Sequence, residues 1–448
     1  MARFLGVCLV GLAVVLAAAS PASAQGFGVY EQGACMMGRA GAGVAAPCQD
    51  GSGVFFNPAS LSFSQVTLTV GAAVIHPGGQ FTDTSGGALN GTVSKLNDKW
   101  YPVPNLYASV PFKKHFAFGI GVFAPYGLTT DWPTTSEGRY LGYKSLVQGI
   151  YVQPTLAIKF NDRVSVGVGV DLTYLKVELR QRVDLSVQAV TGTPYTFAQI
   201  GVPAGTDFAD VQLSGNAWNE GFHVGMQAKV TDKVSFGARF LSGQMVNVTR
   251  GTIRTTQILT GLHLPPTLGG GAIDTAVAPQ FASGQKLSNQ DAKTSIPLPA
   301  QFVAGLAFQA TSAVKLFTDF QFTNWEAFSV LPITGQYLQS TLVESYGNVA
   351  GLRVGTEISA GKKAVIRGGI NVHGAAAPNQ TVTPNLPEGS RYELNAGLGY
   401  ELTKRLRVDA AYMYLAQPDR AGRTTPATNN GVFAFHANLF SASVSVLF

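Results

Sequence analysis

Residues Tyr392–Leu402 have the sequence YELNAGLGYEL, and the chain ends with FSASVSVLF at Phe440–Phe448. In each stretch every second residue is apolar, and most of the residues between are small or polar. Because successive side chains of a β-strand point to opposite faces of the sheet, this period of two predicts strands with one apolar face. An apolar face opposite a polar one is typical of strands that separate lipid from a polar lumen.

The same alternation recurs back through the chain. It predicts an all-β fold, a transmembrane antiparallel β-barrel of about fourteen strands, an even number as in single-chain bacterial barrels. The expected strands span residues 66–75, 104–112, 116–124, 146–160, 164–183, 220–230, 233–243, 299–309, 313–323, 349–358, 363–373, 391–402, 405–415 and 437–448.

The connections between these strands alternate in length. Short polar turns such as Asn161–Arg163 and Thr403–Lys404 follow one end of the strands, and long segments follow the other. Outer-membrane barrels have this asymmetry, with short periplasmic turns and longer extracellular loops. We therefore expect extracellular loops at 76–103, 125–145, 184–219, 244–298, 324–348, 374–390 and 416–436.

Two local features refine the expected barrel. In the strand 164–183 the apolar residues change parity near Tyr174–Lys176, which predicts either a β-bulge or a strand that rises well above the bilayer. Trp325 and Phe328 lie next to an expected loop and are interpreted as part of an interfacial aromatic girdle.

Composition agrees with export to a membrane. Met1–Ala24 has the parts of a cleavable signal peptide, namely Arg3, an apolar run and the small residues Ala22-Ser23-Ala24. Only 12% of the residues are charged and 52 are glycine. After the leader, no apolar run reaches the roughly 18–20 residues of a membrane helix. These features predict a multi-pass β-barrel in the outer membrane of a Gram-negative bacterium.

Between the leader and the first expected strand lies the segment Gly26–Ser62, which is rich in glycine and alanine and has no period of two or 3.6. Such a segment cannot build a core of its own, so we expect a hatch that plugs the lumen. Pro58 fixes its own φ and favours an extended Asn57, which makes Asn57-Pro58-Ala59 a rigid turn. The expected organisation is a signal peptide (1–24), a hatch (25–64) and a barrel (65–448).

Two cysteines remain after the leader, Cys35 and Cys48, both in the expected hatch. An exported protein is in a compartment that favours disulfides, so the pair is predicted to be bridged, the alternative being two free buried thiols. No histidine lies between them, and we predict no metal site.

The segment VFFNPASLS at Val54–Ser62 resembles the hatch and Asn-Pro-Ala motif of the FadL/TodX-type outer-membrane transporters of long-chain fatty acids and hydrocarbons. The cysteine pair departs from what we expect in that family's hatch. The resemblance continues over nearly the whole mature chain, in GVFAPYGLTTDW (121–132), LPAQFVAGLAF (298–308), DFQFTNWEAF (319–328) and LPEGSRYELNAGLGYEL (386–402).

This resemblance implies passive transport of a hydrophobic compound past a hatch and out through the barrel wall. Gly26 and Phe27 would touch an apolar pocket, and Asn57 would anchor the hatch. The family's inward kink in its third strand matches Phe123, Ala124, Pro125, Tyr126 and Gly127, although Pro125 alternatively begins a loop. A substrate groove between the long loops would include Ile258, Leu259, Leu262 and Leu264, unless these loops only pack on each other.

The substrate stays open between long-chain fatty acids and aromatic hydrocarbons. A fatty acid needs a donor for its carboxylate, and Lys176, Arg180 and Arg182 share one parity of their strand; the alternative is a solvated strand edge. The expected partners are this hydrophobic small molecule and outer-membrane lipid with lipopolysaccharide, and we expect a monomer.

Other classes of function are less favoured. A general porin for polar solutes is the main alternative, but several expected lumen positions are small or apolar, such as Gly119 and Phe123. None of the six histidines forms an H-x-x-x-H pair, so we predict no enzyme and no cofactor. Scattered charges without a basic run predict no nucleic-acid partner.

Overall fold

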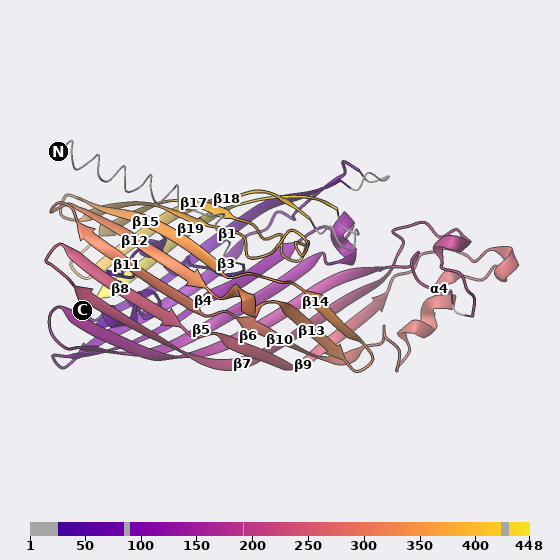
Figure 1. Cartoon of the computed structure of the whole chain (residues 1–448), viewed down its shortest axis with the longest axis horizontal. Helices are drawn as coiled ribbons and strands as arrows, with labels where there is room; N and C mark the ends of the chain where they lie inside the picture. Colours follow the sequence, from indigo (N-terminus) through magenta and orange to yellow (C-terminus); the bar gives the residue numbers. More distant parts are fainter. Residues whose placement is uncertain (1–25, 85–89, 191, 423–429) are drawn as a thin grey trace.

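The strands form a closed, tilted antiparallel barrel, with the short turns at the end that carries the C-terminus (Figure 1). The computed structural model describes residues 26–448 apart from 85–89, 191 and 423–429. The predicted signal peptide, Met1–Ala24, and Gln25 lie outside the described residues. Within the described ranges, no helix combines the length and the hydropathy needed to cross a membrane.

The closed ring has 14 strands, each paired with its two neighbours, and β19 pairs back onto β1 from Thr67↔Leu447 to Asp83↔Gly431. The predicted fold class and the predicted number of strands are therefore confirmed. In ring order the strands are β1 (Thr67–Asp83), β3 (Tyr101–Phe112), β4 (Phe116–Asp131), β5 (Lys144–Lys159), β6 (Val164–Asp184), β7 (Asp207–Lys229), β8 (Val234–Leu241), β11 (Gln301–Gln309), β12 (Val314–Thr323), β15 (Val349–Ala360), β16 (Ala364–His373), β17 (Arg391–Glu401), β18 (Leu406–Ala421) and β19 (Gly431–Leu447).

Alternation places the apolar residues on the outside of this ring. In β17, Leu394 and Leu398 are exposed, whereas Glu393 and Asn395 are buried toward the lumen. This arrangement is the reverse of a soluble protein and leaves an apolar outer surface for lipid to cover. This surface agrees with the membrane-spanning barrel that the alternation predicted.

Several predicted loops contain further strands, and these boundaries need correction. β1 continues to Asp83, β4 continues to Asp131 and β7 begins at Asp207. Above the bilayer an outward side chain no longer has to be apolar, so the lipid-specific alternation fades although the hydrogen-bonded ladder continues. The additional strands are β2 (Val93–Lys95), β9 (Gln244–Gln257), β10 (Gln290–Leu298), β13 (Val330–Gly335) and β14 (Gln339–Val343).

The structure decides between the two interpretations of the parity change in β6. The register between β6 and β7 is continuous from Val164↔Ala228 to Val183↔Ala209, so no β-bulge lies near Tyr174–Lys176. The strand instead rises above the bilayer. Above the bilayer, the apolar side chains of Leu175 and Val177 are buried in the upper lumen. The outer face of the strand is in contact with water at this height, so apolar residues are favoured on the inner face.

The segment before β1, residues 26–64, keeps the name hatch below and is mostly buried against the barrel strands. Its helices are short, and α2 contacts β17 and β18 whereas η1 contacts β5, β6 and β7. The helical elements of the described chain are α2 (Ala34–Met37), α3 (Gly53–Phe56), α4 (Ile273–Val277), η1 (Pro58–Phe63), η2 (Glu137–Tyr140), η3 (Ala198–Ile200), η4 (Pro266–Leu268), η5 (Ala278–Phe281) and η6 (Trp325–Ala327).

Candidate functional site: an apolar cavity, a hatch and a gap in the wall

An apolar cavity of about 40 Å³ is lined by upper barrel strands, the hatch and the loops at 324–348 and 374–390. Val147 of β5, Val177 and Leu179 of β6, and Ile296 of β10 supply part of the lining. The polar lining groups are few, and the lining contains the acidic Glu344 and no lysine, arginine or histidine.

Phe27 of the hatch forms one wall of this cavity. Its ring lies edge-on to Trp325, with 4.7 Å between the ring centroids, and to Phe328, at 5.3 Å. Edge-to-face pairs at these separations are favourable beyond the area they bury. The interpretation of Trp325 and Phe328 as girdle residues is wrong, because both are buried inside the barrel in η6 and the residue after it.

The hatch end is hydrogen-bonded to an irregular part of β4. The register between β4 and β5 shifts between Phe123 and Tyr126, so Ala124 and Pro125 form a β-bulge within the strand. The hatch pairs with β4 beside this bulge through one isolated antiparallel bridge, Gly28↔Tyr126. The Val29 N–H donates to the Pro125 carbonyl at 2.8 Å, and the Gly127 N–H donates to the Phe27 carbonyl at 2.9 Å. Pro125 therefore lies inside the strand and does not begin a loop.

This bulge coincides with a gap in the barrel ladder. In the described part of the chain, pairing between β3 and β4 ends at Leu106↔Val122, although both strands continue beyond it. Above the gap the wall closes again, because the Asn97 N–H donates to the Asp131 carbonyl at 2.8 Å. We call this unpaired stretch the window; the hatch lies beside it, hydrogen-bonded to Pro125 and Gly127.

The other end of the hatch is fixed by Asn57, which is fully buried. Its Nδ2 donates to the Val44 carbonyl at 2.6 Å and to the Met226 carbonyl of β7 at 2.9 Å, while its Oδ1 accepts from the Ala59 N–H at 3.1 Å. The turn lies directly against the wall at Gly225. A Cβ at that position would lie 2.6 Å from Pro58 Cδ, so only glycine permits this approach.

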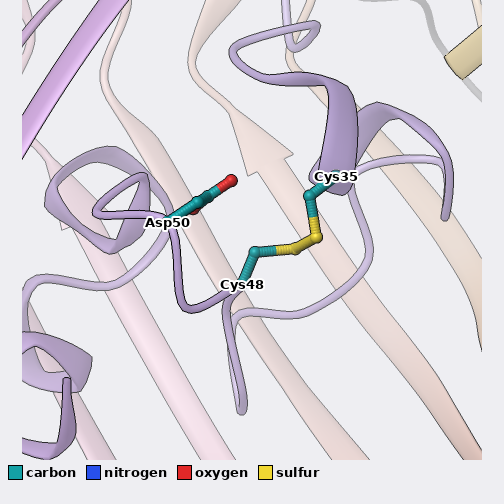
Figure 2. A group of neighbouring side chains, drawn as sticks. All are labelled: Cys35, Cys48 and Asp50. Atoms are coloured by element: carbon teal, nitrogen blue, oxygen red, sulfur yellow. A yellow bond between two sulfur atoms is a disulfide. The ribbon is translucent and has the colours of Figure 1, made fainter. Parts of the chain in front are cut away.

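A disulfide joins Cys35 of α2 to Cys48, with 6.3 Å between the Cα atoms, a usual separation for a bridge (Figure 2). Asp50 lies beside it. Because the two sulfurs are bonded to each other, this group does not offer thiolate ligands for a metal ion. The bridge closes the part of the hatch between α2 and α3.

The structure places the three candidate carboxylate partners away from the cavity. Lys176, Arg180 and Arg182 have the outward parity of β6, opposite to the cavity residues Val177 and Leu179. Arg180 forms an ion pair with Glu178 at 2.7 Å, and Arg182 pairs with Asp210 at 3.4 Å. Their positions correspond to the alternative of a solvated strand edge, because the upper part of β6 stands above the lipid.

The two longest expected loops, 184–219 and 244–298, pack on each other beyond the barrel, where α4 projects at the far end (Figure 1). Leu262 and Leu264 pack against a small apolar core that contains Phe208 and Ile273. These two leucines therefore stabilise the loops, as in the packing alternative. Ile258 is half-buried next to Phe208, and Leu259 is 75% exposed.

Most of the cavity lining was not predicted. Val177 and Leu179 carried a signal, because they caused the parity change in the strand 164–183. The residues from 324–348 and 374–390 carried none, since the short strands β13 and β14 and the irregular segments beside them have no sustained period to interpret. These unpredicted lining residues are Leu331, Leu342, Tyr346, Asn385 and Leu386.

Sequence comparisons agree with this geometry. A family model described as outer membrane protein transport protein (OMPP1/FadL/TodX) matches residues 15–447. The chain is 24% identical over 423 residues to a long-chain fatty acid transport protein of Escherichia coli O6:H1, with 90% of each chain covered. It is 23% identical over 476 residues to outer membrane protein P1 of Haemophilus influenzae, with 97% of each chain covered.

Solved structures share the fold. A Pseudomonas aeruginosa FadL homologue superimposes with a TM-score of 0.80 at 22% identity, covering 95% of this chain and 100% of that chain. The P. putida toluene transporter TodX gives a TM-score of 0.68 at 16% identity, covering 95% of this chain and 99% of that chain. At these identities the likeness establishes the barrel fold and carries no statement about substrate.

Proposed function

Because the chain belongs to the OMPP1/FadL/TodX family of outer-membrane transport proteins, we propose that it takes up small hydrophobic compounds through the side of its barrel. The observation that carries this proposal is the window between β3 and β4, which lies beside the hatch end and the apolar cavity. A porin for polar solutes needs an open polar lumen, whereas this lumen contains a buried hatch.

The proposed path begins at the extracellular loops. A hydrophobic molecule that has crossed the lipopolysaccharide layer enters the cavity beside Phe27. It then leaves through the window into the outer membrane, so it never has to cross the polar lower lumen. No energy source is required, because the molecule moves from water to lipid down its own free-energy gradient.

The hatch would act as the gate on this path. Phe27 belongs both to the cavity wall and to the short pairing with the β4 bulge. A ligand that displaces the Phe27 ring therefore acts on the hydrogen bonds of Val29 and Gly127 at the window. Binding shifts the hatch toward the arrangement that the ligand favours, by as much as the difference between its affinities for the two arrangements.

The chemistry of the cavity best supports an uncharged substrate such as an aromatic or aliphatic hydrocarbon. A carboxylate in a buried site requires a cation or several N–H donors, because the desolvation of an unpaired charge is costly. The cavity lining contains no cationic side chain, and the three cations of β6 point outward. A fatty acid is the second candidate, supported by the relatives that are named long-chain fatty acid transport proteins.

Direct binding to the refolded barrel tests the proposal. Native mass spectrometry or calorimetry would compare toluene with oleate. We expect toluene to bind and oleate to bind more weakly, and the reverse order would make the fatty acid the substrate. If neither compound binds and the protein conducts ions freely in a planar bilayer, the function of a general porin for polar solutes replaces this proposal.

A further inference from the structure

A second interruption of the barrel ladder lies on the other side of the cavity. β7 pairs with β8 from His223 to Lys229 and with β9 from Ala209 to Ser214. For residues 215–221 of β7, all of them described, no ladder partner exists on that side. The facing part of β9, residues 244–251, pairs only with β10. We call this interruption between β7 and β9 the seam.

The seam arises because the facing chain is too long for regular pairing. The path from Leu241 to Thr252 is two residues longer than the path from His223 to Ser214 opposite it. A chain with extra residues bows away from its partner and leaves backbone groups unpaired. The seam is therefore a built irregularity of the wall, like the bulge in β4.

Backbone contacts close the seam at its two ends, whereas side chains fill the middle, where Val248 packs against Gly215 and Gln244 packs against Gly221. At the lower end, the Ser242 N–H donates to the Phe222 carbonyl at 2.9 Å. At the upper end, Gly215 approaches Gly251 so closely that a Cβ on Gly215 would lie 3.0 Å from Gly251 Cα. Between them, the Asn219 Nδ2 donates to the Gln244 Oε1 at a long 3.3 Å. The Nε2 of Gln244 is buried and has no partner.

The seam lies between two strands that line the cavity, β6 and β10. On one side, the cavity residue Val177 of β6 pairs directly with Gly215 of β7. On the other side, the cavity residue Ile296 of β10 pairs with Val246 of β9. Val246 is fully buried in the same apolar cluster. The two strands at the seam are therefore directly attached to the cavity wall.

The outer side of the seam lies at the membrane interface. Trp218 is 65% exposed and Met245 is 51% exposed, and Trp218 packs on Tyr174 with 5.2 Å between the ring centroids. Tryptophan and tyrosine concentrate where lipid headgroups meet the acyl chains. Further down β7, Phe222 is exposed and apolar, as expected of a residue in contact with lipid.

We propose that the seam is a second lateral opening, through which the hydrophobic substrate passes between the cavity and the outer leaflet. The inference rests on the proposed function. Opening requires the loss of one long side-chain hydrogen bond, Asn219–Gln244. The buried side chains of Gln244, Val246 and Val248 also have to shift, but there is no ladder hydrogen bond to break in this stretch. The wall elsewhere would lose several ladder bonds at once.

Crosslinking across the seam tests this inference. Asn219→Cys and Gln244→Cys would be joined by a short bifunctional thiol reagent, and uptake of radiolabelled toluene by cells would be measured before and after reaction. The same pair would be placed in a variant that lacks Ala124, in which the β4 bulge is removed and the first window is expected to close. The matched controls are the unreacted double cysteine variants and each single cysteine variant treated with the reagent.

With two parallel openings, crosslinking the seam lowers uptake by about half in the normal background. In the variant without Ala124 it abolishes the remaining uptake. If crosslinking changes uptake in neither background and uptake is low without Ala124, the seam is not an opening, while the proposed function stands. If uptake stays complete with the bulge removed and the seam crosslinked, the proposed function itself fails.

A second measurement does not depend on the folding of any variant. The unmodified protein in outer-membrane vesicles would be irradiated with a hydrocarbon that carries a diazirine, and the adducts would be mapped by mass spectrometry. We expect adducts at Trp218 and Met245 as well as beside the β3–β4 window. Adducts at the window with none at the seam would overturn the inference.

Discussion

At the scale of single residues, Asn57 connects the hatch to the wall. Its amide binds a carbonyl of the hatch, Val44, and a carbonyl of β7, Met226. Each buried group left without a partner costs about 1–3 kcal/mol. Loss of this side chain therefore loosens the hatch, whereas the barrel keeps its own ladder.

We predict that Asn57→Ala combined with Pro58→Ala impairs uptake of the hydrophobic substrate and leaves the barrel folded. Uptake by cells measures the first effect, and the heat-dependent shift of the barrel on a denaturing gel measures the second. Pro203→Ala, in an exposed loop, is the control. Normal uptake by the double variant would refute the anchoring role of Asn57.

Phe27 is the residue with the most direct contact to the expected ligand. We predict that Phe27→Ala weakens toluene binding about tenfold, which corresponds to about 1.4 kcal/mol of lost contact. Calorimetry on the refolded barrel measures the affinity. Phe308→Ala, which removes an exposed ring from β11, should leave it unchanged. Equal affinities in both variants would place the ligand elsewhere.

At the scale of elements, the loops and the hatch are stabilised separately from the barrel. The disulfide closes a segment of the hatch, and the module formed by the two long loops has its own small core. Elements that contribute few ladder hydrogen bonds can open without unfolding of the whole protein. We therefore expect loss of the disulfide to affect the hatch, and protonation of a carboxyl in the loop module to affect that module.

Removal of the disulfide should loosen the hatch alone. In the chain-entropy model a bridge over about 15 residues contributes about 3 kcal/mol. We predict that Cys35→Ser with Cys48→Ser makes the hatch susceptible to protease, whereas the mobility of the folded barrel on a gel is unchanged. Reducing agent should have no further effect on this variant. Failure of the barrel to fold in this variant would contradict the separate stabilisation of the hatch and the barrel.

The loop module should open in acid. Burial acts to raise the pKa of Asp274, but hydrogen bonds from Thr260 and Gly261 outweigh it and lower that pKa. A carboxyl with a lowered pKa stabilises the fold above its ordinary pKa of about 3.9 and loses this contribution as the pH falls through the lowered value. We predict that pepsin cleaves the module increasingly below about pH 4, and that Asp274→Asn reduces this dependence.

At the scale of the whole molecule, the barrel could be predicted because lipid imposes a period of two on every strand it touches. All 14 ring strands were predicted from this period, and β17 and β19 show it most clearly. The strand extensions above the bilayer were missed, because water tolerates any outward residue. Long-range pairing of β9 and β10 also leaves no local trace in the sequence.

The candidate site was only partly predictable. The hatch turn and the β4 bulge have local signals, since Pro58 and Pro125 restrict the backbone around them. The cavity depends on side chains from distant loops, such as Tyr346 and Leu386, which meet only in the folded protein. Parity showed that Lys176, Arg180 and Arg182 share one face, but the direction of that face became clear only from the register.

The most direct test of the account is uptake of radiolabelled toluene by cells that produce the variant without Ala124. Removal of this residue restores regular pairing beside Phe123 and is expected to close the window between β3 and β4, while the cavity keeps its lining. We predict that uptake falls by about half, because the seam remains as a second opening, and that the purified variant still binds toluene. Undiminished uptake by a variant whose regular β3–β4 pairing is established would contradict passage through the window between β3 and β4.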